Sequence, residues 1–429
     1  MLLTGRTLSF SGDPAVEASS VRYTEKGAVL VSDGNILWTG QAGEEPADLS
    51  AGAERHDYGD NLILPGFVDG HVHYPQIGVI ASFGTQLLDW LKMYTFPEEA
   101  RFADRDHADR TAKLFLDLLL ANGTTTAAVY CTVHPESADA FFAEASARKL
   151  RMIAGKILMD RNAPQSVRDT AQSGYDDTKS LIEKWHGQGR NLYGVTPRFA
   201  PTSTPAQLEA CGTLMSEFPD VYLQSHVSEN IDEVQWVKEL FPVTRSYQDV
   251  YAQFGMLGPR ALYGHAIHMD EVDLAQAAET GTKYVHCPTS NLFIGSGLFR
   301  MHETRDAGVE VMLGSDVGGG TSLSPFATMK AAYEIAQLCG YSLTPEEAFW
   351  QSTSGGADTL LLGHQIGKIE VGFEADIVVL NLNSTPIIRQ RMNQAKSLRD
   401  ILFAQMILAD DRAVRATYAA GRLVYQAED

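Results

Sequence analysis

Histidine and carboxylate side chains stand at the ends of several short apolar segments of this chain, where they could bind a metal ion or carry protons. The first segment ends in Asp-Gly-His-Val-His at positions 69–73. In a strand, the two-residue period places Asp69, His71 and His73 on one face. Three later segments end in further residues of these types, namely His226, His265 and Asp316. Imidazoles with one carboxylate, and with room left for water, are the composition of a catalytic metal site.

A single His-x-His pair is more often a buried structural feature than a metal site. Here, however, four of the twelve histidines stand at the ends of predicted strands together with an aspartate. The four cysteines are scattered and none forms a Cys-x-x-Cys pair, which excludes a disulfide framework and a thiolate zinc site. The sequence therefore predicts a metal held by histidine and carboxylate side chains.

The segments that carry these residues alternate with helix-like stretches. Strands are predicted at 66–73, 124–131, 151–159, 193–200, 221–227, 261–266, 283–287 and 309–316. Helices are predicted at 105–121, 137–149, 204–217, 231–240 and 271–279, with a capping-box-like start at Thr204. This alternation predicts an α/β fold, a (β/α)8 barrel of the TIM type, in which catalytic residues stand at the C-terminal ends of the strands. A doubly wound open sheet is the alternative, but no Gly-x-Gly-x-x-Gly follows the first strand.

The two ends of the chain have a different pattern. Residues 1–64 contain strand-like runs interrupted by Gly, Asp and Pro, without a helical period, and the same pattern returns at 366–382 and 413–425. We therefore expect a small all-β sandwich domain built from residues 1–64 and 366–429. The catalytic barrel is expected at residues 65–365.

The composition limits the partners. Of 429 residues, 34 are Lys or Arg and 54 are Asp or Glu, so the formal net charge of −20 disfavours nucleic acid and anionic membrane surfaces. No stretch approaches the roughly 18 apolar residues of a membrane span, and the first residues lack the features of a signal peptide. We expect a cytoplasmic protein that binds neither nucleic acid nor membranes.

Taken together, these residues resemble a known family. The sequence Pro-Gly-Phe-Val-Asp-Gly-His-Val-His at 65–73, with His226, His265 and Gly-Ser-Asp at 314–316, is similar to the amidohydrolase superfamily. The resemblance covers the whole chain, because 367–376 resembles the segment by which these enzymes leave the barrel and re-enter the small β domain.

Within the superfamily, the resemblance narrows to the branch that deaminates guanine. The sequences that carry it lie at 73–76, 88–91, 94–98, 197–199, 225–230, 286–291 and 316–320. Tyr-Thr-Phe-Pro-Glu at 94–98 and Pro-Arg-Phe at 197–199 are the most specific, since other members share the metal ligands but not these.

The resemblance implies a site residue by residue. One zinc ion per chain would be held by His71, His73, His226 and Asp316. Glu229 would carry the proton, while His265 and Asp316 would hold the reacting water. The residues facing a purine would be Gln76, Arg198, Phe199 and His226.

The implied reaction is zinc-dependent hydrolytic deamination of guanine to xanthine and ammonia, in purine catabolism or salvage, by a homodimer. A single metal is favoured, because binuclear members use a carboxylated lysine on the fourth strand and 193–200 contains none. Lys156, on the third strand, is interpreted as structural.

Two other functions stay open. An amidohydrolase acting on 8-oxoguanine, a pterin or a cyclic amide would keep the metal site and differ at Gln76 and Arg198. A non-catalytic barrel scaffold would be expected to have lost metal ligands, whereas all are present here.

Several single residues also have two interpretations. Arg198 either faces the substrate or forms a structural ion pair, and His286 either lines the site or belongs to the core. Asp69 is expected to orient one of the neighbouring histidines. The aromatic stretch 74–102 is either a packing insertion or a lid over an apolar pocket.

Overall fold

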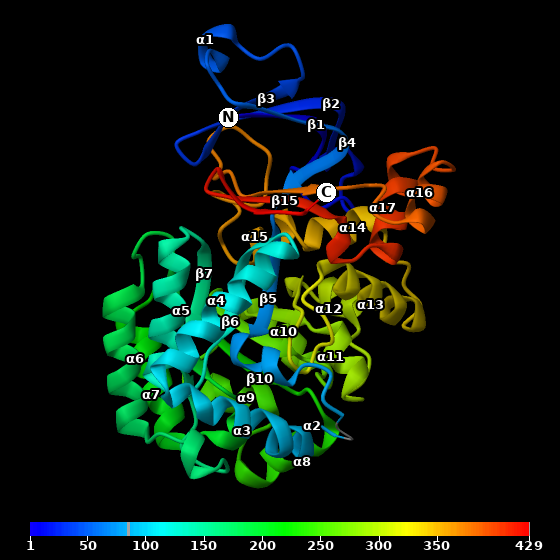
Figure 1. Ribbon diagram of the computed structural model, residues 1–429. Coiled ribbons are helices and arrows are strands. Elements are labelled where there is room, and N and C mark those ends of the chain that lie inside the picture. Colours follow the sequence, from blue (N-terminus) through cyan, green and yellow to red (C-terminus); the bar gives the residue numbers. More distant parts are fainter. Residues whose placement is uncertain (84–85, 429) are drawn as a thin grey trace.

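The chain forms a parallel barrel with a smaller sheet beside it, as the computed structural model of residues 1–83 and 86–428 shows (Figure 1). The barrel strands run in the order β13-β12-β11-β10-β9-β7-β6-β5, and all neighbours are parallel. They are β5 (Phe67–His73), β6 (Thr124–Tyr130), β7 (Arg151–Gly155), β9 (Leu192–Pro197), β10 (Tyr222–Val227), β11 (Ala261–His265), β12 (Lys283–His286) and β13 (Val311–Leu313). The short β8 (Ile157–Leu158) follows β7 and pairs with β9.

Backbone hydrogen bonds bring the first and last barrel strands together. The amide of Asp316 donates to the carbonyl of His71 (2.7 Å), and the amide of His73 donates to the carbonyl of Val317 (2.8 Å). The predicted eight-stranded barrel is therefore confirmed, and its seam lies beside two of the predicted ligands.

Helices follow the barrel strands and cover them on the outside (Figure 1). They are α4 (Arg105–Ala121), α5 (Pro135–Ala147), α6 (Ala171–Trp185), α7 (Pro205–Glu217), α8 (Ile231–Leu240), α9 (Tyr247–Gln253), α10 (Glu271–Thr280), α11 (Pro288–Phe293), α12 (Met301–Asp306), α13 (Pro325–Leu338), α14 (Pro345–Gln351) and α15 (Ser354–Thr359). Two of them, α4 and α8, have the predicted bounds. The side chain of Thr204 accepts a hydrogen bond from the Gln207 amide (3.3 Å), so Thr204 caps α7 as predicted. The Gln207 side chain donates to Asp169 (2.7 Å) and does not complete a capping box.

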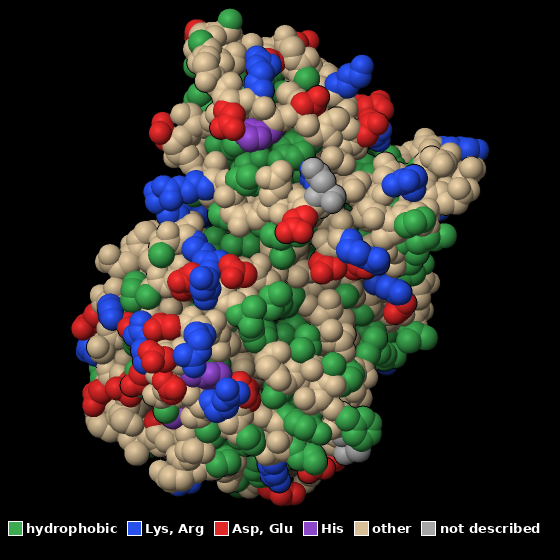
Figure 2. Space-filling view, in the orientation of Figure 1, with side chains coloured by type: hydrophobic (Ala, Val, Ile, Leu, Met, Phe, Trp, Pro, Cys, Tyr) green, Lys and Arg blue, Asp and Glu red, His purple; other side chains and the backbone are tan. Residues whose placement is uncertain are grey.

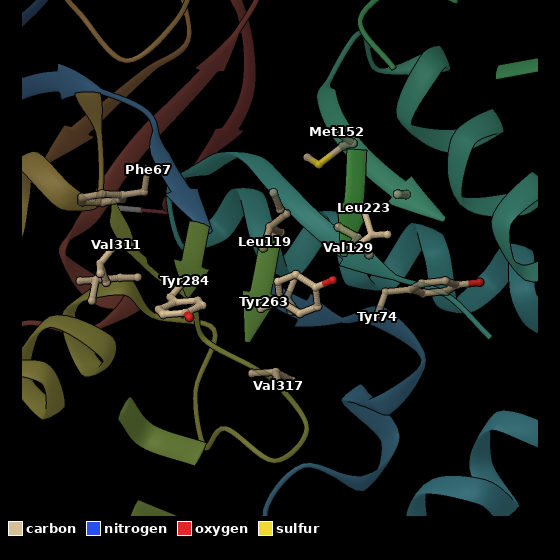
Figure 3. Close-up of a cluster of buried hydrophobic side chains, with 14 of the residues drawn as sticks. Phe67, Tyr74, Leu119, Val129, Met152, Leu223, Tyr263, Tyr284, Val311 and Val317 are labelled. Carbon is tan, nitrogen blue, oxygen red and sulfur yellow. The ribbon is translucent and has the colours of Figure 1, made fainter. Parts of the chain in front are cut away.

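The main core lies between the barrel strands and these helices (Figure 3). Leu119 of α4 belongs to the same buried cluster as Val129 of β6. Buried tyrosines in this layer keep a partner for the hydroxyl: Tyr74 donates to the Ser137 carbonyl (2.8 Å) and Tyr263 to the Met256 carbonyl (2.9 Å). The apolar layer thus fixes the strands whose ends carry the site.

The smaller sheet is built from both ends of the chain, as predicted. Its order is β16-β15-β14-β4-β1-β2-β3. The strands are β1 (Leu2–Phe10), β2 (Val21–Ser32), β3 (Asn35–Gln41), β4 (Arg55–Pro65), β14 (Ile377–Leu380), β15 (Val414–Ala419) and β16 (Arg422–Gln426). A sandwich would consist of two stacked sheets, but hydrogen bonds link all seven strands into one mixed sheet, because β4 pairs with β1 on one edge and with β14 on the other. The domain boundaries at residues 64 and 366 stay a prediction.

Further helices lie outside this alternation. In the C-terminal part, α16 (Pro386–Met392) precedes α17 (Leu398–Leu408), which packs against α13 and α14. The short helices elsewhere are α1 (Ala47–Ser50), α2 (Leu87–Trp90) and α3 (Phe96–Glu99), with a π-helical turn at Leu91–Thr95 between the last two. Within residues 1–83 and 86–428, no helix is both long and apolar enough to cross a membrane.

Charged side chains of both signs are interspersed on the surface over α4, α5 and α6 (Figure 2). Ion pairs link these elements, for example Arg105 to Asp139 (2.6 Å) and Arg148 to Asp117 (2.6 Å). On this face the net negative charge is therefore not gathered into one acidic patch.

A cluster of ion pairs joins the segment leading into β14 to the barrel. Arg151, at the start of β7, donates to Glu374 (Nε to Oε2, 2.8 Å), and Arg190 bonds both Glu374 and Asp376. Burial alone would raise the pKa of Glu374, but the two guanidinium groups outweigh it and lower the pKa.

We predict that Glu374→Gln lowers the free energy of unfolding by about 1.5–3 kcal/mol at pH 7, because hydrogen bonds to a charged partner are lost. The native pKa of Glu374 is lowered, so its contribution is complete above the unfolded value of about 4.3 and disappears as the pH falls through the native pKa. Urea unfolding at pH 7 and pH 3 should show a smaller difference between variant and wild type at pH 3. Asp60→Asn, at an exposed ion pair with Arg6, is the control and should change stability by less than about 0.5 kcal/mol. An equal loss at both pH values would contradict the prediction.

Candidate metal centre and substrate cavity

Four predicted ligands converge at the C-terminal end of the barrel. The Nε2 atoms of His71, His73 and His226 lie 3.1–3.2 Å from one another. Oδ1 of Asp316 lies 3.3 Å from Nε2 of His71 and 3.5 Å from Nε2 of His73. A tetrahedral ion with ligands at about 2.0–2.1 Å requires ligand atoms about 3.3 Å apart. The spacing of these atoms therefore fits a zinc-sized ion.

The ionisation of the cluster also fits a divalent cation. Burial lowers the pKa of His71, and lowers the pKa values of His73 and His226 well below the usual range, which favours the neutral form that can bind a metal. Burial acts to raise the pKa of Asp316, but the neighbouring histidines outweigh it and lower the pKa. Nδ1 of His226 lies 2.6 Å from the Arg198 carbonyl and donates its proton there, which leaves Nε2 with a lone pair facing the cluster.

His265 adjoins the same cluster. Together with His71, His226 and Asp316, it offers ligand atoms that all lie within 4.8 Å of one another. Its Nε2 is 3.6 Å from Oδ2 of Asp316, the carboxylate oxygen not used toward His71 and His73. The nitrogen atoms of His71, His73 and His226 lie closer together than the ligand atoms of the set that contains His265. We therefore place His265 beside the ligands and not among them.

The backbone around the site makes room for the ligands. A Cβ atom at Gly264 would lie 2.7 Å from Cε1 of His71, and one at Gly314 would lie 2.8 Å from Cβ of His71. His265 and Asp316 follow these glycines and adopt positive φ angles of 72° and 49°. Non-glycine residues rarely adopt such conformations, and they concentrate at functional sites. The Gly-His and Gly-Ser-Asp sequences therefore combine a close approach to His71 with an uncommon backbone conformation at the strand ends, where His265 and Asp316 reach the cluster.

Asp69 does not orient a neighbouring imidazole, contrary to expectation. Its Oδ1 accepts from the backbone amides of His71 (3.1 Å) and Ser315 (3.0 Å), and its Oδ2 accepts from the Ser315 hydroxyl (2.5 Å). Burial raises the pKa of Asp69 to about 6. The carboxylate ties β5 to the segment after β13, because both sides of the barrel seam present amides to it.

Glu229 lies beside His265 and lines the same cavity as His73, His226 and Asp316. Its Oε2 is 3.5 Å from Nε2 of His265, and its Oε1 accepts a hydrogen bond from the Ser296 hydroxyl (3.0 Å). Burial raises the pKa of Glu229 to about 7. A carboxyl group with this pKa can accept and return a proton near neutral pH.

Asn291 holds the other side of His265. Its Oδ1 lies 2.8 Å from Nδ1 of His265, which fixes the proton on that nitrogen. Burial acts to lower the pKa of His265, but the charges of Glu229 and Asp316 outweigh it and raise the pKa. The sequence analysis did not assign Asn291 or Ser296 a role, although Asn291 ends the 286–291 sequence that carried the resemblance.

A cavity opens beside the cluster. It has about 400 Å³ of space free of protein atoms and is lined by His73, Gln76, Leu87, Trp90, Leu91, Arg198, Phe199, His226, Glu229, His265, Ile294, Asp316 and Gly319. Apolar side chains from 87–91 form part of its wall. Of the two interpretations of 74–102, the described residues therefore favour a cover over the site; residues 84 and 85 lie outside the described part of the chain.

Arg198 forms the ion pair that one of its two interpretations predicted, and its contact with a substrate stays a prediction. Arg198 lines the cavity, and its Nη1 donates to both oxygens of Glu99 (2.9 and 2.8 Å). The amide of Gln76 also donates to Glu99 (2.9 Å). Sequence analysis missed Glu99, because it stands one residue beyond the Tyr-Thr-Phe-Pro-Glu sequence and no metal-ligand or strand pattern marks it.

Two residues with open roles lie outside the site. His286 stacks on Phe299 with ring centroids 4.8 Å apart, and burial lowers the pKa of His286 to about 3, so it belongs to the core. Lys156 is buried and pairs with Asp169 (2.7 Å), in line with its structural interpretation.

Comparisons with known proteins agree with this geometry. The amidohydrolase family model matches residues 62–424. Guanine deaminase of Escherichia coli is 44% identical over 414 residues, which cover 96% of this chain and 94% of that protein. The solved structure of E. coli guanine deaminase superposes with a TM-score of 0.98 at 43% identity, covering all of both chains. Guanine deaminase from C. acetobutylicum, solved with guanine bound in the active site, has a TM-score of 0.88 at 28% identity and 99% coverage of both chains.

We predict that His226→Ala removes bound metal, because it takes away one of the four proposed ligands and leaves a cavity at its position. Metal analysis of protein purified without chelators should give about one equivalent of metal in the wild type and less than about a tenth in the variant. His302→Ala, at a half-exposed histidine outside the cluster, is the control and should keep the metal. Full metal content in His226→Ala would contradict the assignment.

Proposed function

The chain belongs to the amidohydrolase family, and on that basis we propose that it hydrolyses guanine to xanthine and ammonia with one zinc ion per chain. The observation that carries the proposal is the set of residues that line a single cavity. Members of the proposed metal site, a protonatable glutamate and the N–H groups of Gln76 and Arg198 all line this one cavity. The guanine deaminases that resemble this chain cover nearly its whole length.

His71, His73, His226 and Asp316 would hold the zinc ion. When bound there, zinc acts as a Lewis acid that lowers the pKa of a water molecule from about 15.7 to about 7. His71, His73 and Asp316 are buried and His226 is partly buried, which limits the access of bulk water to these positions.

Glu229 moves the proton in this proposal. It accepts a proton from the attacking water and passes it to a nitrogen of the purine ring. The proton that remains on the added oxygen is then transferred to the C2 amine, which departs as ammonia. Oxygen is thereby bonded to C2 and the C–N bond is broken, so guanine and water give xanthine and ammonia. The contact of Glu229 with Nε2 of His265 directs its carboxylate toward the ligand cluster.

Arg198, Gln76 and Phe199 bind the base in this proposal. Guanine presents the acceptors O6 and N7 on one edge, which a guanidinium group can meet with N–H donors. Adenine carries an amino donor at that edge and would leave buried donors unpaired, which can reduce its reactivity by about 10⁴–10⁵. Phe199 lines the cavity and offers an apolar face to the ring. The homodimer implied by the resemblance stays a prediction.

The proposed reaction is tested by ammonia release from a panel of bases. Guanine should be deaminated, and adenine and cytosine should react at least about 10⁴ times more slowly. Including 8-oxoguanine and a pterin in the panel tests the alternative substrates. A faster reaction with either of those, or no ammonia from guanine, would refute the proposed substrate while leaving the metal-hydrolase assignment intact.

We predict that Glu229→Gln lowers kcat for guanine by at least about 100-fold, because the amide cannot accept a proton. Metal content should match that of the wild type, since Glu229 is not among the proposed ligands. Glu239→Gln, on the exposed surface of α8, is the control and should keep wild-type kcat. Activity of Glu229→Gln within a few-fold of wild type would remove Glu229 from this role.

A further inference from the structure

A buried carboxylate stands behind the part of the cavity that is proposed to bind the base. Glu99, the last residue of α3, has no exposed surface. Its Oε1 accepts hydrogen bonds from Nε2 of Gln76 (2.9 Å) and Nη1 of Arg198 (2.9 Å), and its Oε2 accepts from the same Nη1 (2.8 Å). Gln76 and Arg198 both line the cavity, whereas Glu99 does not. Glu99 therefore acts on any ligand only through these two side chains.

Glu99 determines which way the amide of Gln76 faces. An ionised carboxylate only accepts hydrogen bonds, so it selects the NH2 group of Gln76 as its neighbour. A second hydrogen bond supports this orientation, because Oε1 of Gln76 accepts from the Gly318 backbone amide (3.3 Å). The reversed amide would place oxygen against carboxylate and NH2 against N–H. Gln76 is thus left with a second N–H and offers the cavity a donor.

Glu99 also holds the guanidinium group of Arg198. Phe96 lies three residues before Glu99 on the same short helix. The guanidinium carbon of Arg198 lies 5.5 Å from the centroid of the Phe96 ring. The ion pair is almost fully buried, with 4% of the Arg198 side chain and none of the Glu99 side chain exposed. A guanidinium group has five N–H donors and no acceptor, so Arg198 too can only donate to a ligand.

We propose that Glu99 is the positioning residue for base specificity: by holding Gln76 and Arg198 as donors, it makes this end of the cavity select purines with an oxygen at position 6. The inference rests on the proposed function for the placement of a purine here. An oxygen at position 6 is an acceptor for the donor pair, whereas an amino group or a hydrogen leaves a buried donor unpaired. The carboxylate also balances the charge of Arg198, so that a neutral base can bind without bringing a negative charge.

The neighbouring Glu98 provides a matched control. Glu98 is also a glutamate and lies on the same helix as Glu99, but it does not line the cavity. It pairs with Arg101 (2.7 Å) and lies near His107 (3.6 Å). Glu98→Gln therefore removes a carboxylate from α3 without changing the donors that face the cavity.

The test measures binding of two unreactive bases to the metal-loaded protein by calorimetry. Hypoxanthine and purine both lack the 2-amino group, and hypoxanthine carries the oxygen at position 6 that purine lacks. Wild type and Glu98→Gln should bind hypoxanthine more tightly than purine. Glu99→Gln should reduce this preference by at least about tenfold, because its amide can present NH2 to Arg198 and oxygen to Gln76. Glu99→Asp, which keeps the charge but shortens the side chain, should reduce the preference as well.

Each outcome decides between the proposals. If Glu99→Gln and Glu99→Asp weaken both bases equally and leave the ratio unchanged, Glu99 is only a structural ion-pair partner and the inference fails. A wild type without preference for hypoxanthine also refutes it. If the wild type keeps the preference but releases no ammonia from guanine, the proposed function fails and the role of Glu99 in base recognition stands.

Discussion

The position of Asp316 is the constraint on which the rest of this structure depends. Its backbone amide helps to close the barrel by donating to the His71 carbonyl, and its side chain meets the imidazoles of His71 and His73. Closure of the sheet and assembly of the site therefore depend on the same residue. The ends of the first and last strands must be adjacent before the carboxylate can reach the histidines, and Asp69 holds them together by accepting amide hydrogen bonds from both sides of the seam. Because the carboxylate is buried, an open seam would leave both the metal ligands and the backbone amides without partners.

Sequence reasoning reached the parts of the site that follow from strand period and strand ends. His71, His73, His226 and Asp316 lie at the ends of segments whose apolar pattern marks them as strands, so their convergence follows from the parallel barrel alone. What depends on contacts between distant segments was not predictable in this way. Asp69 was expected to bond an imidazole, yet it bonds backbone amides across the seam, and no local pattern distinguishes these two partners.

Contacts between distant segments also explain why the single small sheet and the role of Glu99 were not predicted. The strand-like runs at both chain ends were found from composition and period. The pairing of β4 with both β1 and β14, which joins all strands into one sheet, is a choice of neighbours that local sequence does not encode. Glu99 sits in an apolar, aromatic stretch where a carboxylate is expected to face solvent, and its burial makes sense only beside Arg198, which is 99 residues away in the sequence.

The proposed metal ligands and the residues proposed to recognise the base are held by different kinds of structure in this cavity. The ligands stand on barrel strands and in the turns directly after them, where core packing leaves little freedom of position. The residues proposed to recognise the base are held largely by one insertion between β5 and α4, because Gln76, Phe96 and Glu99 all come from it, whereas Arg198 and Phe199 directly follow β9. Substitutions in the insertion can therefore change which groups face a ligand without moving the metal ligands. A barrel that keeps its metal chemistry while exchanging such an insertion can act on a different heterocycle, and this is a physical reason why one fold serves many substrates.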